Sequence, residues 1–323
     1  MKCSLLLSFE TPLNAQILTK LVFISTVSSI VMSARSDTEY DDQIQTVRDK
    51  FFEQLKSNPT LIGTIDAEDI AKINKCDWFV RRWLLHNNGN LDPSVEQLIT
   101  AVQWRHEMGF RRLAPNYFPN EMYRVGGLFF YEPTQDGQPT LYLRLARVKK
   151  IPEVNELVKK FVSYMLWQLD ERADGHGFVI VFDFLGAGLS NCDLDIAKHL
   201  ISTLTRHFSM GMANAYAVDF PWILRAFWAM VKNMVPASRR SLLKFCSRAE
   251  LLSHIDGDRL PTSLGGSCQS PTTGWAVAPQ GSPSCVEFGV NVLGIPRERC
   301  EKLFEVFIPM LEPDDDPKAI HKC

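Results

Sequence analysis

The hydrophobic pattern of this chain changes its period partway along, and this change limits the folds that the chain can adopt. Between residues 41 and 109, apolar side chains recur every three or four positions, as on one face of a helix. Beyond Pro119, short apolar runs bounded by Pro, Gly, Asp or Asn indicate strands at residues 127–131, 141–148, 178–184, 214–220 and 242–246. The sequence therefore predicts an all-helical front section followed by a section built around a sheet.

Helical stretches separate most of the predicted strands. Residues 153–172 and 193–208 have helical periodicity, and residues 221–235 begin with a proline at a first-turn position. Alternation of strand and helix is typical of a mostly parallel sheet flanked by crossover helices. The predicted fold class is α/β, with a helical amino-terminal section at residues 41–110 and a sheet domain at residues 111–266.

The remaining segments lack the pattern of a packed domain. Residues 1–40 form an uncertain leader, because the apolar stretch at 21–34 is shorter than the about 20 residues that cross a bilayer. Residues 267–295 are rich in Gly, Ser, Thr and Pro, which predicts a linker. Residues 296–323 are expected to hold a short helix at 297–308 and an acidic tail.

Charge and cysteine content argue against several classes of protein. The 35 basic residues nearly balance 37 acidic ones, so bulk charge does not favour a nucleic-acid partner. Eight cysteines are scattered without a C-x-x-C pair, and the histidines show no metal-binding spacing. We therefore expect free thiols in a reducing compartment, no metal and no cofactor.

A glycine turn after the third predicted strand provides an enzyme alternative. Gly186 and Gly188 begin like a dinucleotide-binding fingerprint, but Asn191 stands where the third glycine is required. Asp183 could act as a base there, although an Asp near a strand end more often caps the following turn. We expect no catalytic site and keep a dinucleotide-dependent oxidoreductase as a distant alternative.

The segment at residues 221–235 is apolar on almost every side of a helix. Such a helix either lies buried in the core or has two apolar partners, as a lid does when it lies between a ligand cavity and a membrane. Between residues 221 and 260 there are seven basic and three acidic residues. This excess would suit anionic lipid headgroups, and it would equally suit a solvated face.

Taken together, several motifs resemble the CRAL-TRIO lipid-binding family over residues 41–266. In the front section they are residues 79–84, 91–92 and 104–105; in the sheet section they are residues 178–186, 219–221, 258–261 and 264–266. The resemblance implies a helical front section and a mostly parallel sheet that holds a lipid behind a mobile gate helix, here residues 221–235. Asp219 departs from the asparagine that is usual in the family.

The resemblance also implies where a ligand would bind. Lys232 falls where members that hold a phosphoinositide place a headgroup lysine, and Arg225 is a second candidate for headgroup contact. No acidic partner for this lysine is evident, since the nearest positions hold His199 and Leu200. The candidates for the gate and the cavity wall are Phe227, Trp228, Val231, Met234, Phe182 and Phe184.

The predicted function is non-enzymatic binding or transfer of a phospholipid or another hydrophobic ligand at a membrane surface. The protein would be cytoplasmic and would associate reversibly with membranes. The alternative is a protein-interaction or membrane-tethering module that keeps the fold without a ligand. It would use the apolar helix or residues 297–308 to contact a protein partner.

Overall fold

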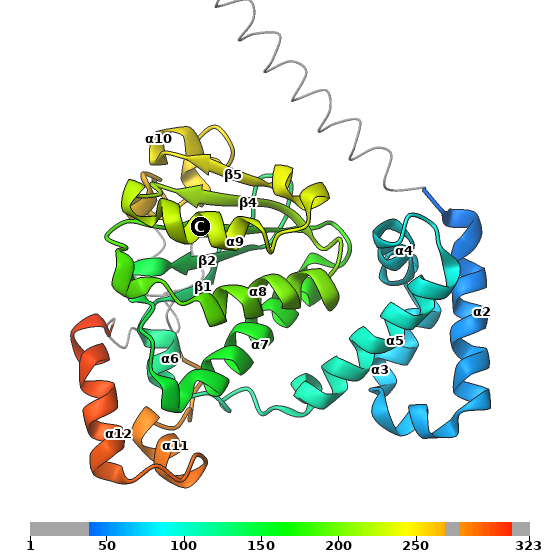
Figure 1. Ribbon diagram of the computed structural model, residues 1–323, viewed down its shortest axis with the longest axis horizontal. Coiled ribbons are helices and arrows are strands. Elements are labelled where there is room, and N and C mark those ends of the chain that lie inside the picture. Colours follow the sequence, from blue (N-terminus) through cyan, green and yellow to red (C-terminus); the bar gives the residue numbers. More distant parts are fainter. Residues whose placement is uncertain (1–38, 269–277, 312–323) are drawn as a thin grey trace, which may run out of the picture.

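The front section is a bundle of four helices with a core of its own. The computed structural model describes residues 39–268 and 278–311. In it, α2 (Asp41–Ser57), α3 (Ala67–Lys75), α4 (Asp77–His86) and α5 (Leu91–Met108) lie together at one side of the molecule (Figure 1). Phe51, Trp83 and Leu98 are fully shielded from solvent in their shared core. The predicted helical periodicity of this section is confirmed.

The second section contains a five-stranded sheet in the described part of the chain. The strands are β1 (Leu128–Tyr131), β2 (Thr140–Arg144), β3 (Phe178–Asp183), β4 (Met212–Val218) and β5 (Leu243–Cys246). They lie in sequence order; β1 pairs antiparallel with β2, and all other neighbours are parallel. The mixed α/β fold is thus confirmed, and every predicted strand is present. The second strand is shorter than predicted because a 3-10 turn begins at Leu145.

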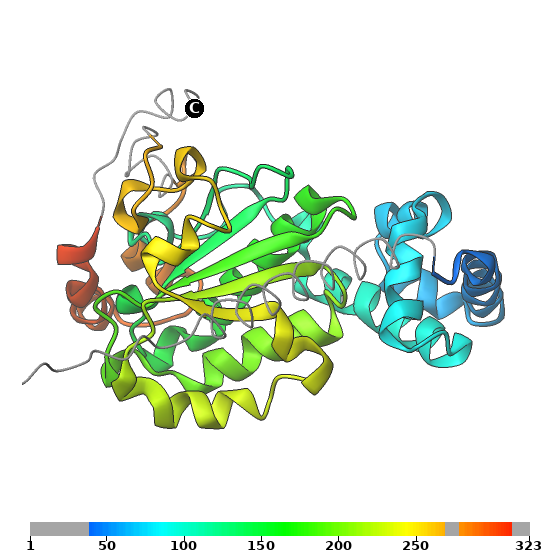
Figure 2. The same cartoon turned by 90° about the horizontal axis from the view of Figure 1, so that it is seen from above.

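Helices connect the parallel strands. α7 (Asn155–Ala173) leads from β2 to β3, α8 (Leu194–Arg206) from β3 to β4, and α9 (Arg225–Lys232) from β4 to β5. Figure 2 shows α8 and α9 on one face of the sheet and the segment around α10 (Arg248–Leu251) on the other. Both faces are therefore covered, as a parallel sheet requires.

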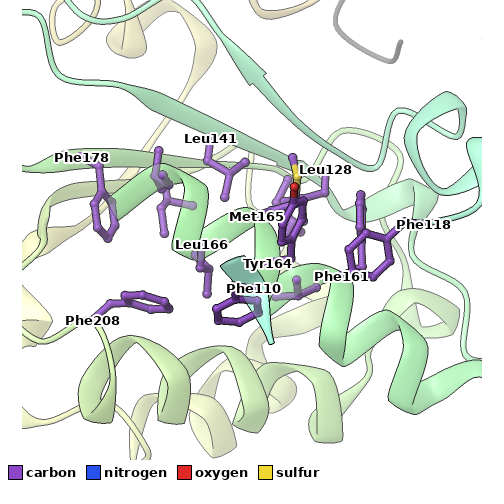
Figure 3. Close-up of a cluster of buried hydrophobic side chains, with 14 of the residues drawn as sticks. Phe110, Phe118, Leu128, Leu141, Phe161, Tyr164, Met165, Leu166, Phe178 and Phe208 are labelled. Carbon is purple, nitrogen blue, oxygen red and sulfur yellow. The ribbon is translucent and has the colours of Figure 1, made fainter. Parts of the chain in front are cut away.

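Side chains alternate between the two faces of the sheet. Tyr142, Val179 and Tyr216 point to the α10 side, where Leu251 and Leu260 complete a small core. The alternate positions point to α7 and α8 and enter a larger core. Figure 3 shows the side chains of Phe178, Phe208 and Leu166 meeting in that core. Period-two alternation thus separates two apolar layers within one sheet.

A buried ionic cluster joins the front section to the sheet section. Asp170 on α7 accepts from Arg82 Nη2 at 2.8 Å and from Arg105 Nη2 at 3.0 Å, and the three side chains are at most 6% exposed. Arg82 Nε also donates to the carbonyl oxygen of Ser209 at 2.6 Å. The two guanidinium groups come from α4 and α5, so this cluster fixes both helices against α7.

The region after Gly266 is more ordered than the predicted linker. Residues 269–277, like the leader through residue 38 and the tail from residue 312, lie outside the described residues. However, α11 (Cys285–Asn291) begins with a capping box between Ser284 and Glu287 and inserts the buried Phe288 into the larger core. The linker prediction is wrong for this stretch. The predicted helix at 297–308 corresponds to α12 (Arg297–Phe304) and a 3-10 helix, η11 (Glu305–Met310).

Candidate functional site

A cavity of about 560 Å³ lies between the sheet and the helices α7, α8 and α9. Pockets that bind small molecules usually measure about 300–1,000 Å³. Most of the lining is aliphatic or aromatic and comes from β2 to β5 and from one face of each of the three helices. The arrangement can enclose an apolar molecule between the sheet and the helices.

The sequence of β3 and β4 explains why this space exists. Phe182 belongs to the same alternating set of β3 residues as Phe178 and Ile180, which face the larger core. On the neighbouring strand, Ala215 and Ala217 lie at the base of the cavity, and both are buried. Their methyl side chains are too short to reach the helices, so a volume stays open between this part of the sheet and the helices.

The short helix α9 covers the cavity from the solvent side. Phe227, Trp228 and Val231 line the cavity, while Met230 on the same helix is 50% exposed. No residue of α9 is buried, so the alternative of a helix buried in the core is wrong. Only Arg225–Lys232 is α-helical within the predicted 221–235, because a 3-10 turn precedes it and Pro236 follows soon after.

A row of aromatic contacts connects α9 to the carboxyl ends of the strands. Phe184 packs edge-to-face on Phe220 with 4.8 Å between ring centroids, and Phe220 packs on Phe245 at 5.3 Å. Trp228 then packs on Phe245 at 5.1 Å. Sequence reasoning missed Phe220 and Phe245. The alternation in β5 could have found Phe245, since it follows Leu243 by two positions and both side chains line the cavity.

The residues selected from the sequence divide into two groups. The structure brings five of them together on the cavity wall: Phe182, Phe184, Phe227, Trp228 and Val231. The other three, Arg225, Lys232 and Met234, are not on the wall. Arg225 and Lys232 are exposed on the outer side of the cover, and Met234 is half-buried.

The charged side chains that line the cavity differ in whether a hydrogen-bond partner compensates their charge. Glu121 accepts from the backbone N–H of Cys285 at 2.7 Å, and Asp193 caps α8 by accepting from the backbone of Asp195 at 2.9 Å. At another part of the wall, burial and then the charge of Arg239 lower the pKa of His86. Burial also lowers the pKa of Arg239 itself. Both side chains therefore lie in a poorly hydrated place, which disfavours the charged form of each.

The glycine turn after β3 is occupied by its own side chains. The backbone N–H of Gly188 donates to Asn191 Oδ1 at 2.9 Å, and Asn191 Nδ2 donates to the carbonyl oxygens of Ala146 and Val148 at 3.1 and 2.9 Å. Asp183 accepts from the backbone of Leu185 at 2.9 Å and so caps the turn. The polar groups of the turn therefore form hydrogen bonds within the chain, and this removes the support for a dinucleotide fingerprint.

Within 39–268 and 278–311, His, Cys, Asp and Glu side chains form no group of three that could hold a metal ion. In the same ranges, no helix combines the length and the hydropathy that a membrane span needs.

Residues 123–266 match the family model of the CRAL/TRIO domain. Among curated proteins, a CRAL-TRIO domain-containing protein of Schizosaccharomyces pombe is 22% identical over 211 residues, which are 61% of this chain and 47% of that protein. The Sec14 cytosolic factor of the same yeast is 24% identical over 212 residues, 59% of this chain and 74% of that protein. The chain thus spans only about half of the first of these relatives.

Another curated protein and a solved structure are also similar to this chain. Human tyrosine-protein phosphatase non-receptor type 9 is 20% identical over 210 residues, 63% of this chain and 35% of that protein. A crystal structure of Sfh5 shares the fold with a TM-score of 0.56 at 15% identity, covering 82% of this chain and 98% of that one. Residues 123–266 are therefore similar in sequence to the CRAL/TRIO domain, and the Sec14-like relatives and the fold of Sfh5 agree with this similarity.

Proposed function

We propose that this protein binds and transfers a lipid or another small hydrophobic ligand in the cavity beneath α9, without catalysing a reaction. The observation that carries the proposal is the apolar cavity of about 560 Å³ between the sheet and the helices α7, α8 and α9. CRAL/TRIO proteins bind lipophilic ligands. Because burial of apolar surface is worth about 25 cal/mol per Å², an acyl chain would gain ample free energy there.

In this proposal α9 acts as a gate at a membrane surface. Its inner face meets the cavity, while Met230 and the preceding Trp222 and Ile223 are 50%, 75% and 42% exposed. A membrane would bury these apolar side chains and so favour an open position of the helix, whereas water favours the closed one. Met234 would belong to the moving segment, because it lies two residues after the end of the helix.

The two exposed cations of α9 would contact the membrane. Arg225 and Lys232 lie outside the cavity wall, so we propose that they bind the headgroups of anionic lipids while Trp222 enters the interface. A basic side chain near an anionic surface contributes about 1 kcal/mol. Residues 111–266 would surround most of the ligand, while the end of α4 at Leu85 and His86 would complete the wall and the rest of residues 41–110 would support it.

Native mass spectrometry of protein purified without detergent tests ligand binding. We expect one lipid per chain, and Phe227→Asp should lower the occupancy because it places a charge on the cavity wall. Protein that is empty, and that also takes up no lipid from vesicles, would contradict the proposal.

Vesicle co-sedimentation tests the membrane step separately. Trp222→Asp should reduce association with vesicles that contain anionic lipid, as should the pair Phe227→Asp and Trp228→Asp. Ile62→Asp is the matched control, because Ile62 is 54% exposed but belongs to the front section. Unchanged association of the double variant would disprove the gate.

A second candidate function is a protein-interaction or tethering module. Exposed apolar side chains at the carboxyl-terminal end of the described chain favour it, since Val306 and Ile308 on η11 are 44% and 63% exposed. A protein partner could cover them. This function predicts that lipid-free protein is the physiological form, so the same occupancy measurement separates the two candidates.

We also propose a closer relation within the family. The front half of the chain and residues 219–222 and 246–250 resemble motile sperm domain-containing protein 2, which implies action at the endoplasmic reticulum and at membrane contact sites. A fluorescent fusion of the full chain tests this: we expect a cytoplasmic signal with a reversible fraction on the endoplasmic reticulum. A signal confined to other membranes would contradict it.

A further inference from the structure

We propose that Phe304 and Phe307 limit the length of the apolar chain that the cavity accepts. They belong to α12 and η11, which lie beyond the residues 123–266 that match the CRAL/TRIO domain. The inference rests on the proposed lipid-binding function and adds a determinant of ligand specificity to it.

Both aromatic rings reach the cavity from a segment near the carboxyl end of the described chain. Phe304 ends α12 and Phe307 lies on η11; the two side chains line the cavity, with 6.4 Å between their ring centroids. Their neighbours Val306 and Ile308 are 44% and 63% exposed, so η11 presents different sides to the cavity and to solvent. The segment therefore closes part of the wall with two large apolar side chains.

This part of the wall lies across the sheet from the contact between α9 and β5. Trp228 of α9 packs on Phe245 of the edge strand β5, whereas Arg147, in the 3-10 turn after β2, donates from Nη1 to the carbonyl oxygen of Met310 on η11 at 2.5 Å. The strands β3 and β4 lie between β2 and β5. Figure 1 shows α9 beside β5 and α12 at the far side of the sheet domain. A ligand that enters beneath α9 would therefore meet α12 and η11 with the far ends of its chains.

The fold anchors this segment at several points, as a limit on chain length requires. Phe288 of α11 is buried in the larger core. α12 packs closely on α11, because a Cβ atom at Gly289 would lie only 2.6 Å from Cys300 Sγ. Arg299 on α12 also pairs with Glu153, which precedes α7. The two phenylalanines thus come from a held segment, whereas no residue of α9 is buried.

The neighbouring wall suits the end of an apolar chain. Leu128, Leu145 and Leu157 line the cavity from β1, from the turn after β2 and from α7. Each methylene that moves from water into such surroundings strengthens binding about fourfold. A chain too long for the space before Phe304 and Phe307 would leave methylenes in water or displace the rings, and both outcomes weaken binding.

A series of acyl lengths tests the proposal. Vesicles contain an equimolar mixture of phosphatidylcholine and phosphatidic acid, each with saturated chains from myristoyl to arachidoyl; the full chain is incubated with them and re-isolated, and native mass spectrometry identifies the bound lipids. We expect uptake by the unmodified protein to fall steeply above one chain length. Phe304→Ala and Phe307→Ala should each raise the uptake of lipids two carbons longer by about tenfold relative to lipids at this limit, because two further methylenes become buried. Phe307→Trp should move the limit to shorter chains.

Val306→Ala is the matched control, because it shortens an exposed side chain of the same 3-10 helix and should keep the limit unchanged. Uptake independent of chain length in the unmodified protein, or an unchanged limit in both alanine variants, would overturn the inference. If Phe304→Ala does not fold, as judged by circular dichroism, an unchanged limit in Phe307→Ala alone overturns it. Uptake of no lipid of any length would refute the proposed function itself.

Discussion

The front section and α9 both pack against the sheet domain, but different forces hold them there. Arg82 and Arg105 of the front section are buried against Asp170 by direct ion pairs. α9 has no buried residue, and its aromatic anchor, Trp228 on Phe245, is only half-buried. Removal of one partner from a buried charge cluster costs about 3–5 kcal/mol, whereas an aromatic pair is worth about 0.5–1.5 kcal/mol. Buried charges therefore fix the front section, whereas the weaker contacts of α9 would permit the opening that the proposed gate requires.

The largest effect is expected at the ionic cluster. Asp170→Asn should lower the free energy of unfolding by about 3–5 kcal/mol, because it leaves the buried guanidinium group of Arg82 without a counter-charge and that of Arg105 with Glu171 alone, at 3.5 Å. Urea unfolding at pH 7 measures it. Arg299→Gln is the control, since its ion pair with Glu153 is exposed and should contribute at most about 1 kcal/mol. Equal losses in both variants would mean that the cluster does not fix the front section.

The pH dependence of this cluster follows from the sign of its pKa shift. Burial opposes ionisation of Asp170, but Arg82 and Arg105 outweigh it and hold the pKa below the ordinary 3.8. The stabilisation is therefore fully present above pH 3.8 and is lost as the pH falls through the lower, folded value. Neutral and mildly acidic solutions should leave the cluster intact.

A smaller effect is expected at a histidine in the same junction. His207 stacks on Trp104 at 3.9 Å, and burial, followed by the charge of Arg105, lowers its pKa from 6.5 to about 4. The unfolded chain binds a proton between these values and the folded one does not, so stability falls as the pH drops below 6.5. Between pH 7.5 and pH 5 the loss should be about 2 kcal/mol.

His207→Phe tests this by keeping a ring against Trp104 while removing the titration. We expect the variant to lose about 2 kcal/mol less than the unmodified protein over that pH interval, as measured by urea unfolding. His176→Phe, at an exposed position, should not alter the pH dependence. An unchanged slope in His207→Phe would show that another group governs acid stability.

The smallest effect on stability, with the clearest effect on exchange, is expected at the anchor of α9. Phe245 is 46% exposed, so Phe245→Ala should cost only about 1 kcal/mol. It should nevertheless accelerate the transfer of a fluorescent lipid between vesicles several-fold, because Trp228 loses its partner. Leu252→Ala is the control, at a position 41% exposed on the α10 side of the sheet. A transfer rate equal to that of the control would place the anchor elsewhere.

Much of the fold was predictable because its signals are local. The period of three to four residues identified α2 to α5, and short apolar runs identified each strand. The linker prediction failed at residues 285–291. It rested on the Gly, Ser, Thr and Pro content of the segment and did not consider the capping box of Ser284 and Glu287, which starts a helix there. The local sequence around Phe288 also gives no sign that this side chain packs against Tyr117, which lies far away along the chain.

The candidate site was only partly predictable. Phe182, Phe227 and Trp228 were found because alternation and an all-apolar helix mark positions that need an apolar neighbour. Arg239 was counted only within a general basic excess, and no local pattern connected it with His86. Lys232 was selected by resemblance, yet the helix turns it to the outside.

The sequence by itself determined the order and type of the elements, because hydrophobic periodicity, turn residues and helix caps act over a few neighbouring positions. Only the tertiary structure decided which face of α9 meets the cavity, that Ala215 and Ala217 leave the cavity open, and that His86 approaches Arg239. These relations join residues that are far apart in the chain. Their contacts depend on how whole layers pack, and no short-range pattern records that packing.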